Sequence, residues 1–290
     1  MEFSMGNNQF YWDKETTSDF YQRVADSSVE HVYLGESVCS KRRELRLEDW
    51  LEIGRELTNK GKSVVLSSLA LLEAKSELAT LKKVCLNGEL KVEANDFGAV
   101  EILFEAKIPF IAGAALNIYN QHDLKVLLDR GMQRWVIPVE LSRDWLVNVL
   151  AGCEELGIRE QIETEVYGYG YLPLAYSARC FTARSEDRPK DQCALCCIKY
   201  PEGRKIDSQE GLELFRMNGI QTMSGSIQNL INDLPSMEGL VDIVRISPHS
   251  MEAIDWVDTF RNALVDKIRL PLEGFCNGYW HKIEGMKAIQ

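Results

Sequence analysis

Short apolar runs recur along the chain roughly every 20 to 30 residues, and longer amphipathic stretches separate them, a pattern typical of alternating strands and helices. Runs such as residues 31–36 and 63–66 are mainly apolar, as expected of strands buried on both faces. We predict strands at residues 2–5, 31–36, 63–66, 90–94, 109–113, 134–138, 161–166, 219–223 and 240–246. We predict helices at residues 14–25, 47–60, 69–85, 96–105, 120–131, 142–156 and 251–263.

This alternation indicates parallel β-α-β units. With about eight strands of this kind, we expect a (β/α)8 TIM-barrel-like parallel barrel rather than an open doubly wound sheet. No G-x-G-x-x-G motif follows the first predicted strand, which weakens the dinucleotide-binding alternative. We therefore expect residues 1–290 to form a single barrel domain, with its working groups on loops at the C-terminal ends of the strands.

Composition narrows the range of partners and compartments. The net charge of -11 disfavours duplex DNA or an anionic membrane as the main partner, because binding to phosphates depends on Lys and Arg. The chain has no apolar run of about 18 residues and no basic start followed by an apolar stretch, so we expect a cytoplasmic protein without a membrane span. Thiols stay reduced there, so the eight cysteines are interpreted as metal ligands and small buried residues.

Residues 177–201 have the composition of a loop whose structure depends on something other than the packing of apolar side chains. This segment contains Cys180, Cys193, Cys196 and Cys197 among many charged residues. The Cys-x12-Cys-x3-Cys spacing of three of them can hold a metal or an iron-sulfur cluster if a fourth ligand comes from elsewhere. Cys39 follows the strand at residues 31–34, so it can face the same end of the barrel and is the obvious fourth donor.

The residues alone leave alternatives open. Cys193-x2-Cys196 is also a zinc knuckle spacing, so zinc and iron-sulfur both remain candidates. The adjacent Cys196 and Cys197 are not both expected to be ligands, because neighbouring side chains rarely converge on one centre. Cys85 and Cys153 are predicted core residues on helices, and the position of Cys276 is ambiguous.

Sequence signals for other kinds of functional site are weaker. No nucleophile-elbow pattern G-x-S-x-G occurs, which disfavours a serine protease. Four polar residues lie at predicted strand ends, where they could line a pocket or simply cap loops: Glu36, Glu93, Asn95 and Glu140.

Several long motifs resemble those of the U32 peptidase-like family, over essentially the whole chain. They are YLGESVCSKRR at residues 33–43, PVELSRDW at 138–145, ARCFTAR at 178–184, NGIQTMSG at 218–225 and CNGYW at 276–280. Within the family, the likeness is strongest to members that act in ubiquinone biosynthesis. The resemblance implies a barrel-type fold and a 4Fe-4S cluster on Cys39, Cys180, Cys193 and Cys197, which selects Cys197 over Cys196.

The resemblance also implies a partner and a reaction. It implies a heterodimer with a UbiU-like U32 protein, which hydroxylates the ubiquinone ring without molecular oxygen. Because no membrane segment is expected, a lipid-carrier protein or the partner would present the ubiquinone precursor. Two other interpretations stay open: a cluster-bearing electron-transfer or scaffold subunit without its own substrate site, and, with weaker support, a U32 peptidase.

Overall fold

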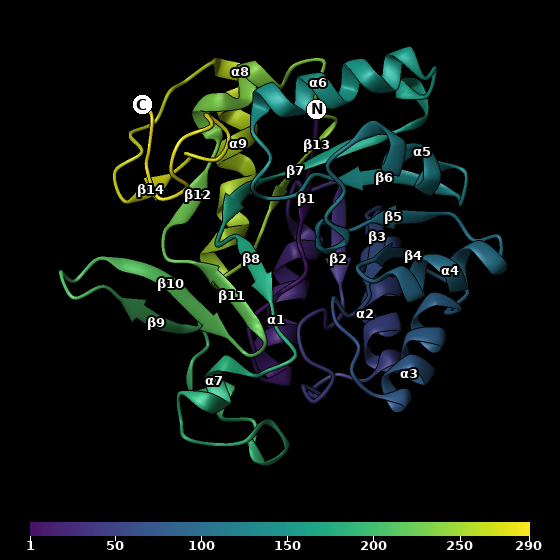
Figure 1. Cartoon of the computed structure of the whole chain (residues 1–290), viewed down its shortest axis with the longest axis vertical. Helices are drawn as coiled ribbons and strands as arrows, with labels where there is room; N and C mark the ends of the chain where they lie inside the picture. Colours follow the sequence, from purple (N-terminus) through teal and green to yellow (C-terminus); the bar gives the residue numbers. More distant parts are fainter.

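Eight parallel strands close into a barrel in the computed structural model, which describes residues 1–290 (Figure 1). The barrel closes because β13 pairs in parallel with both β1 and β7. This confirms the predicted TIM-barrel-like fold. The barrel strands are β1 (Glu2–Met5), β2 (His31–Leu34), β3 (Ser63–Ser67), β4 (Lys91–Ala94), β5 (Phe110–Ala112), β6 (Met132–Val136), β7 (Glu163–Gly170) and β13 (Ile243–Ile246).

Long helices cover the outside of the barrel (Figure 1). Their starts follow capping chemistry: the Asp13 carboxylate accepts a hydrogen bond from Thr16 N, and Ser142 Oγ accepts one from Trp145 N. Their apolar faces bury side chains such as Phe20 and Leu146 in the main core, together with outward-facing strand residues. These helices are α1 (Lys14–Asp26), α2 (Leu47–Asn59), α3 (Lys75–Cys85), α4 (Phe97–Glu105), α5 (Gln121–Leu128), α6 (Arg143–Glu155) and α9 (Asp255–Asp266).

Between β7 and β13 the chain forms an insertion with its own antiparallel sheet, in the order β8-β11-β10-β9. The predicted strand at residues 219–223 belongs to this sheet and not to the barrel, so its expected place was wrong. In Figure 1 the sheet extends to one side of the barrel, and α7 lies below it. The elements are β8 (Pro173–Tyr176), α7 (Phe181–Arg184), β9 (Arg204–Asp207), β10 (Glu213–Asn218), β11 (Gln221–Ser224), β12 (Ile227–Asn229) and α8 (Leu234–Met237).

Short elements complete the chain. Strand β12 pairs antiparallel with the end of β7, and β14 (Phe275–Cys276) adds to β12. Single 3-10 turns lie at η1 (Ala114–Leu116), η2 (Arg159–Gln161), η3 (Lys190–Gln192), η4 (Cys196–Lys199), η5 (Ile231–Asp233) and η6 (Met251–Ile254).

Two predicted boundaries differ from the structure for identifiable reasons. The helix expected from residue 69 begins only at Lys75, because Ser68 N donates to Glu93 O on β4 and Ala70 N donates to Ser37 O in the loop after β2 instead of a helical turn. Strand β7 runs on to Gly170 rather than ending at residue 166, because its last residues keep pairing with β13 and β12.

Charged side chains fill part of the barrel interior. The Glu165 carboxylate is fully buried and accepts hydrogen bonds from Arg245 Nε at 2.8 Å and Arg134 Nη1 at 3.3 Å. Arg245 Nη2 also donates to Glu93 Oε1 at 2.9 Å, and its guanidinium lies 3.9 Å from the centre of the Tyr33 ring. Two carboxylates and two guanidinium groups therefore balance one another inside the barrel.

The close approach of β7 and β13 depends on Gly170, which has a φ of +120°. A Cβ at this position would lie 2.5 Å from Ser247 O. We expect Gly170→Ala to lower the free energy of unfolding by about 2 kcal/mol or more, through backbone strain combined with overpacking. Gly61→Ala is the matched control, because Gly61 also has a positive φ but open space around it, and it should cost only about 1 kcal/mol. Urea denaturation that gives equal losses for the two variants would contradict this account.

Candidate functional site

Cysteines from two distant parts of the chain meet beyond the C-terminal ends of β2 and β7. Cys180 and Cys196 are buried together with Val38, Ala183 and Ile220, and Cys39 and Cys193 pack against this group. We call the five thiols the cysteine cluster: Cys39, Cys180, Cys193, Cys196 and Cys197. The loop after β2 and the inserted segment therefore share one face of the barrel, as the strand order predicted.

Local hydrogen bonds place the first of these thiols. The Glu36 carboxylate accepts from Val38 N at 2.7 Å and from Cys39 N at 2.9 Å, which fixes the turn after β2. The preceding Gly35 has a φ of +99°, and a Cβ there would lie 2.9 Å from Ser67 O. A side chain at position 35 would therefore displace the turn that carries Cys39.

Backbone contacts with the β10–β11 turn place the inserted segment. Phe181 N donates to Gly219 O at 2.7 Å, and Cys180 Sγ accepts from Ala183 N at 3.4 Å as the cap of α7. Ala194 and Leu195 both have positive φ, at 47° and 51°, so the chain reverses between Cys193 and Cys196. This reversal brings Cys196 and Cys197 back toward Cys180.

Arg42 is a buried cation beside the thiols. Its guanidinium donates from Nη1 to Gln9 O at 2.7 Å and from Nη2 to Asn218 Oδ1 at 2.6 Å, and the residue is 4% exposed. Its Nε is buried without a hydrogen-bond partner. A buried donor without an acceptor, next to a set of thiols, fits an anionic group such as a thiolate-ligated metal or cluster.

Burial controls the protonation of these thiols. It raises the pKa of Cys197 to about 11, although the neighbouring Arg42 charge acts to lower it. Burial likewise raises the pKa of Cys39 and of Cys196. At neutral pH the three thiols therefore keep their protons, and a metal that binds them must displace protons.

The four cysteines predicted to hold the cluster lie in one region, but their side chains are not spaced as the ligands of a metal ion. No group of three or more His, Cys, Asp or Glu side chains in the structure is spaced to hold a metal ion. Cys196 is 4% exposed and lies near Cys180 and Cys193, whereas the partly exposed Cys197 lies near Arg42, Cys39 and Cys180. Both residues thus approach Cys180, and the assignment of Cys197 over Cys196 stays a prediction.

The other cysteines lie elsewhere. Cys85 and Cys153 are buried in the main core, which confirms their prediction. Cys276 is buried on β14 with its Sγ 3.8 Å from Ser226 O, outside the cysteine cluster. Burial raises the pKa of both Cys85 and Cys276 to about 12, so these thiols are inert at neutral pH.

The four polar residues expected at strand ends have separate roles. Glu36 supports the Cys39 turn, and its Oε1 lies 3.9 Å from Arg42 Nη1. Glu93 turns into the barrel toward Arg245, and Asn95 Nδ2 donates to Ser68 O and to Glu93 Oε2. Glu36 also borders a cavity, of only about 30 Å³, and Glu140 lines a larger one.

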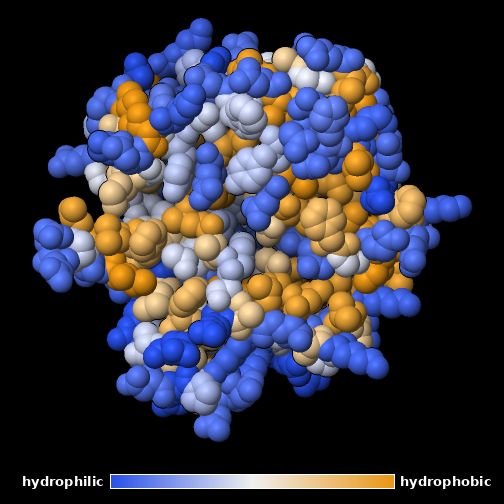
Figure 2. Space-filling view, in the orientation of Figure 1, coloured by the Kyte–Doolittle hydropathy of each residue, from blue (hydrophilic) through white to orange (hydrophobic).

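That cavity, which the sequence did not predict, lies at the C-terminal mouth of the barrel and has a volume of about 270 Å³. Figure 2 shows apolar side chains on both sides of a hollow near the middle of the face, next to β8. Tyr176 lines the cavity and also packs against the buried group that contains Cys180 and Cys196. We call it the mouth cavity, lined by Ala70, Ala114, Ala115, Asn117, Tyr119, Val139, Glu140 and Pro173 to Tyr176.

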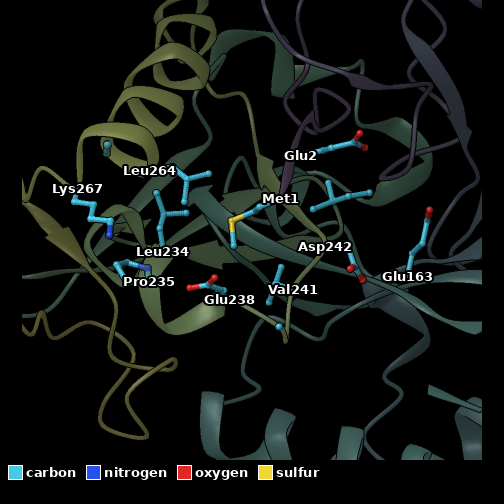
Figure 3. A pocket seen from close by; sticks show the side chains of 13 residues that line it. Met1, Glu2, Glu163, Leu234, Pro235, Glu238, Val241, Asp242, Leu264 and Lys267 are labelled. Carbon is cyan, nitrogen blue, oxygen red and sulfur yellow. The ribbon is translucent and has the colours of Figure 1, made fainter. Parts of the chain in front are cut away.

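A larger cavity of about 840 Å³ lies at the opposite end of the barrel (Figure 3). Met1, Glu2, Glu163 and Asp242 line it, and they belong to the N-terminal ends of β1, β7 and β13. In barrels of this kind the chemistry is at the C-terminal face, and the N-terminal face contributes to stability. The cysteine cluster and the mouth cavity therefore remain the candidate site, despite their smaller volume.

The fold and the site define a (β/α)8 barrel with a cysteine-bearing insertion after its seventh strand. Residues 12–274 match the model of peptidase family U32, so the chain belongs to that family. None of its helices is long and apolar enough to cross a membrane.

Three solved structures show a weak likeness to this chain. A dihydropteroate synthase from Coxiella burnetii is 6% identical over 91% of this chain and 94% of that chain, with a TM-score of 0.43. A dihydropteroate synthase from Thermus thermophilus is 10% identical over 90% and 93% of the two chains, also with a TM-score of 0.43. A phospho-2-dehydro-3-deoxyheptonate aldolase from Thermotoga maritima is 7% identical over 92% and 69%, with a TM-score of 0.41. At this level the likenesses say nothing about activity.

Proposed function

We propose that this chain is the iron-sulfur subunit of an oxygen-independent hydroxylase in cytoplasmic ubiquinone biosynthesis, similar to the U32 protein UbiV. Its partner would be a UbiU-like U32 protein, and Cys39, Cys180, Cys193 and Cys197 would hold a 4Fe-4S cluster. The observation that carries the proposal is the convergence of Cys39 with the inserted cysteines on the C-terminal face. Membership of the U32 family and the motif likeness described above support the same function.

The surroundings of the cysteine cluster suit such a group. When bound, a 4Fe-4S cluster supplies one-electron transfer. Arg42 would offset the negative charge of four thiolates, and its free Nε would donate a hydrogen bond toward them. Val38, Ala183 and Ile220 would keep water away from the buried side of the thiols.

Two other functions are consistent with parts of the site. The partial exposure of Cys193 and Cys197 favours electron exchange with a partner, as in an electron-transfer or scaffold subunit without its own substrate site. A peptidase is compatible with the name of the family. The proposed hydroxylase differs from both because it needs a partner chain and a substrate ring, which a lipid-carrier protein would present.

The test of the proposed function is genetic. Cells that lack the gene should lose ubiquinone when grown without oxygen. They should keep it when grown with oxygen, because an O2-dependent hydroxylase, which needs no oxygen-sensitive cluster, can then modify the ring in place of this chain. A plasmid copy of the gene should restore ubiquinone, and a copy with Cys180→Ser should not. Loss of ubiquinone in both conditions, or in neither, would contradict the proposal. Normal ubiquinone together with peptide hydrolysis by the purified chain would favour the peptidase.

A further inference from the structure

We propose that the mouth cavity is a binding site for a small, uncharged aromatic molecule that carries a hydroxyl group, and that Tyr176 separates this molecule from the cysteine cluster. Apolar residues make up eight of the eleven that line the cavity, and Glu140 is the only charged one. A cavity of about 270 Å³ lies just under the usual range for small-molecule sites, so it suits one ring with short substituents.

The walls of the cavity favour a flat apolar group. Ala114 and Ala115 come from the turn after β5, and their short side chains leave the space free. Leu174 on β8 lies among the other lining residues, and Ala114, Val139 and Leu174 also pack on the apolar layer that closes the top of the barrel. Three of the lining residues thus connect the cavity to the apolar layer below it.

The rim of the cavity favours a hydroxyl group and disfavours an anion. Glu140 is the charged residue of the lining, and its charge acts on Tyr119, which also lines the cavity, and on Tyr279. Burial raises the pKa of both tyrosines, and the negative charge of Glu140 raises it further. A ligand hydroxyl can donate to this carboxylate, whereas a ligand carboxylate would be repelled by it.

Tyr176 joins the cavity to the cysteine cluster. Gln221 Nε2 donates to its hydroxyl at 3.1 Å, and this contact fixes the side chain, which lines the cavity and packs against the buried group that contains Cys180 and Cys196. A ring in the cavity would therefore lie one aromatic side chain away from that buried group. As the ring site of the hydroxylase, the cavity rests on the function proposed above, but the binding of a ring does not itself need a cluster.

Binding of three ligands of matched size tests the inference: p-cresol, toluene and 4-methylbenzoate. Titration of the full chain, followed by NMR or calorimetry, should show p-cresol binding about tenfold more tightly than toluene, through one hydrogen bond to a charged acceptor. 4-Methylbenzoate should not bind to the wild-type protein. In Glu140→Gln the advantage of p-cresol over toluene should shrink, and 4-methylbenzoate should begin to bind.

A blocking variant shows where the ligand binds. Ala115→Phe should fill the cavity and abolish p-cresol binding without changing the melting temperature much, whereas the same change at the exposed helix residue Ala79 should leave binding intact. Equal binding of the three ligands, or p-cresol binding that survives Ala115→Phe, would overturn the inference. These outcomes are separate from the proposed function: a chain with iron and sulfide but no p-cresol binding refutes only the ring site, and a chain with p-cresol binding but no iron refutes only the cluster.

Discussion

Protein with Cys180→Ser, purified without oxygen, should retain only a small part of the iron and acid-labile sulfide found in the wild-type protein. The serine hydroxyl can still accept the hydrogen bond from Ala183 N that starts α7, so the change removes a ligand while keeping the local fold. Cys39→Ser and Cys193→Ser should have the same effect, since each removes one of the thiolates proposed to hold the cluster. The measurement is iron and sulfide per chain, together with the absorption spectrum.

Core cysteines provide the matched control. Cys153→Ser should keep its iron and brown colour, because Cys153 lies in the main core away from the cysteine cluster. The comparison of Cys196→Ser with Cys197→Ser decides between the adjacent thiols, and we expect Cys197→Ser to lose the iron. Wild-type protein with stoichiometric zinc and no sulfide would contradict the iron-sulfur assignment, since zinc also accepts ligands made only of thiolates.

Glu165→Gln should lower the free energy of unfolding by about 3 to 5 kcal/mol, because it leaves Arg134 and Arg245 buried without their shared carboxylate. Glu163→Gln is the control, since Glu163 pairs with the same Arg134 but has a side chain that is 57% exposed. The control should cost no more than about 1 kcal/mol, as surface ion pairs usually do. Urea denaturation at pH 7 measures both, and similar losses would argue against a buried charge network.

The same carboxylate predicts a pH dependence. Burial acts to raise the pKa of Glu165, but the charges of Arg245 and Arg134 outweigh it and hold the pKa at about 2, below the ordinary value of 4.5. Its stabilising contribution is thus fully present above pH 4.5 and is lost as the pH falls toward 2. Between these values the wild-type protein should lose stability more steeply than Glu165→Gln, and parallel curves would contradict the assignment.

The barrel was predictable because each of its strands has an apolar run of its own, and every strand except β7 is followed by a covering helix. The sheet to which residues 219–223 belong was not predictable, because an apolar run does not show which sheet it joins. A signal was present, however. The two-residue loop Gly219-Ile220 starts with a glycine, as tight hairpin turns often do, Gly219 has a φ of +65°, and β10 and β11 pair on either side of this turn.

The meeting of the cysteines was predictable because the C-terminal ends of parallel strands share one face of a barrel. The role of Arg42 was not, since Lys41, Arg42 and Arg43 look equivalent in the sequence. Only Arg42 is held by Gln9 and Asn218, which are distant in the chain. The sequence also did not predict that Arg134 and Arg245 lie inside the barrel. Their shared partner Glu165 is on another strand, so it is distant from both in the sequence.

The closure of the barrel by β13 also sets the order in which a newly made chain can fold. Strand β1 is synthesised first, yet its pairing of Phe3 with Val244 must wait until nearly all of the chain has left the ribosome. Contacts between such distant residues form late in folding. The inserted cysteines emerge before β13 does, so during synthesis they are available while the barrel beneath them is still unclosed. A metal bound as proposed above would therefore have access to this segment before the protein has finished folding.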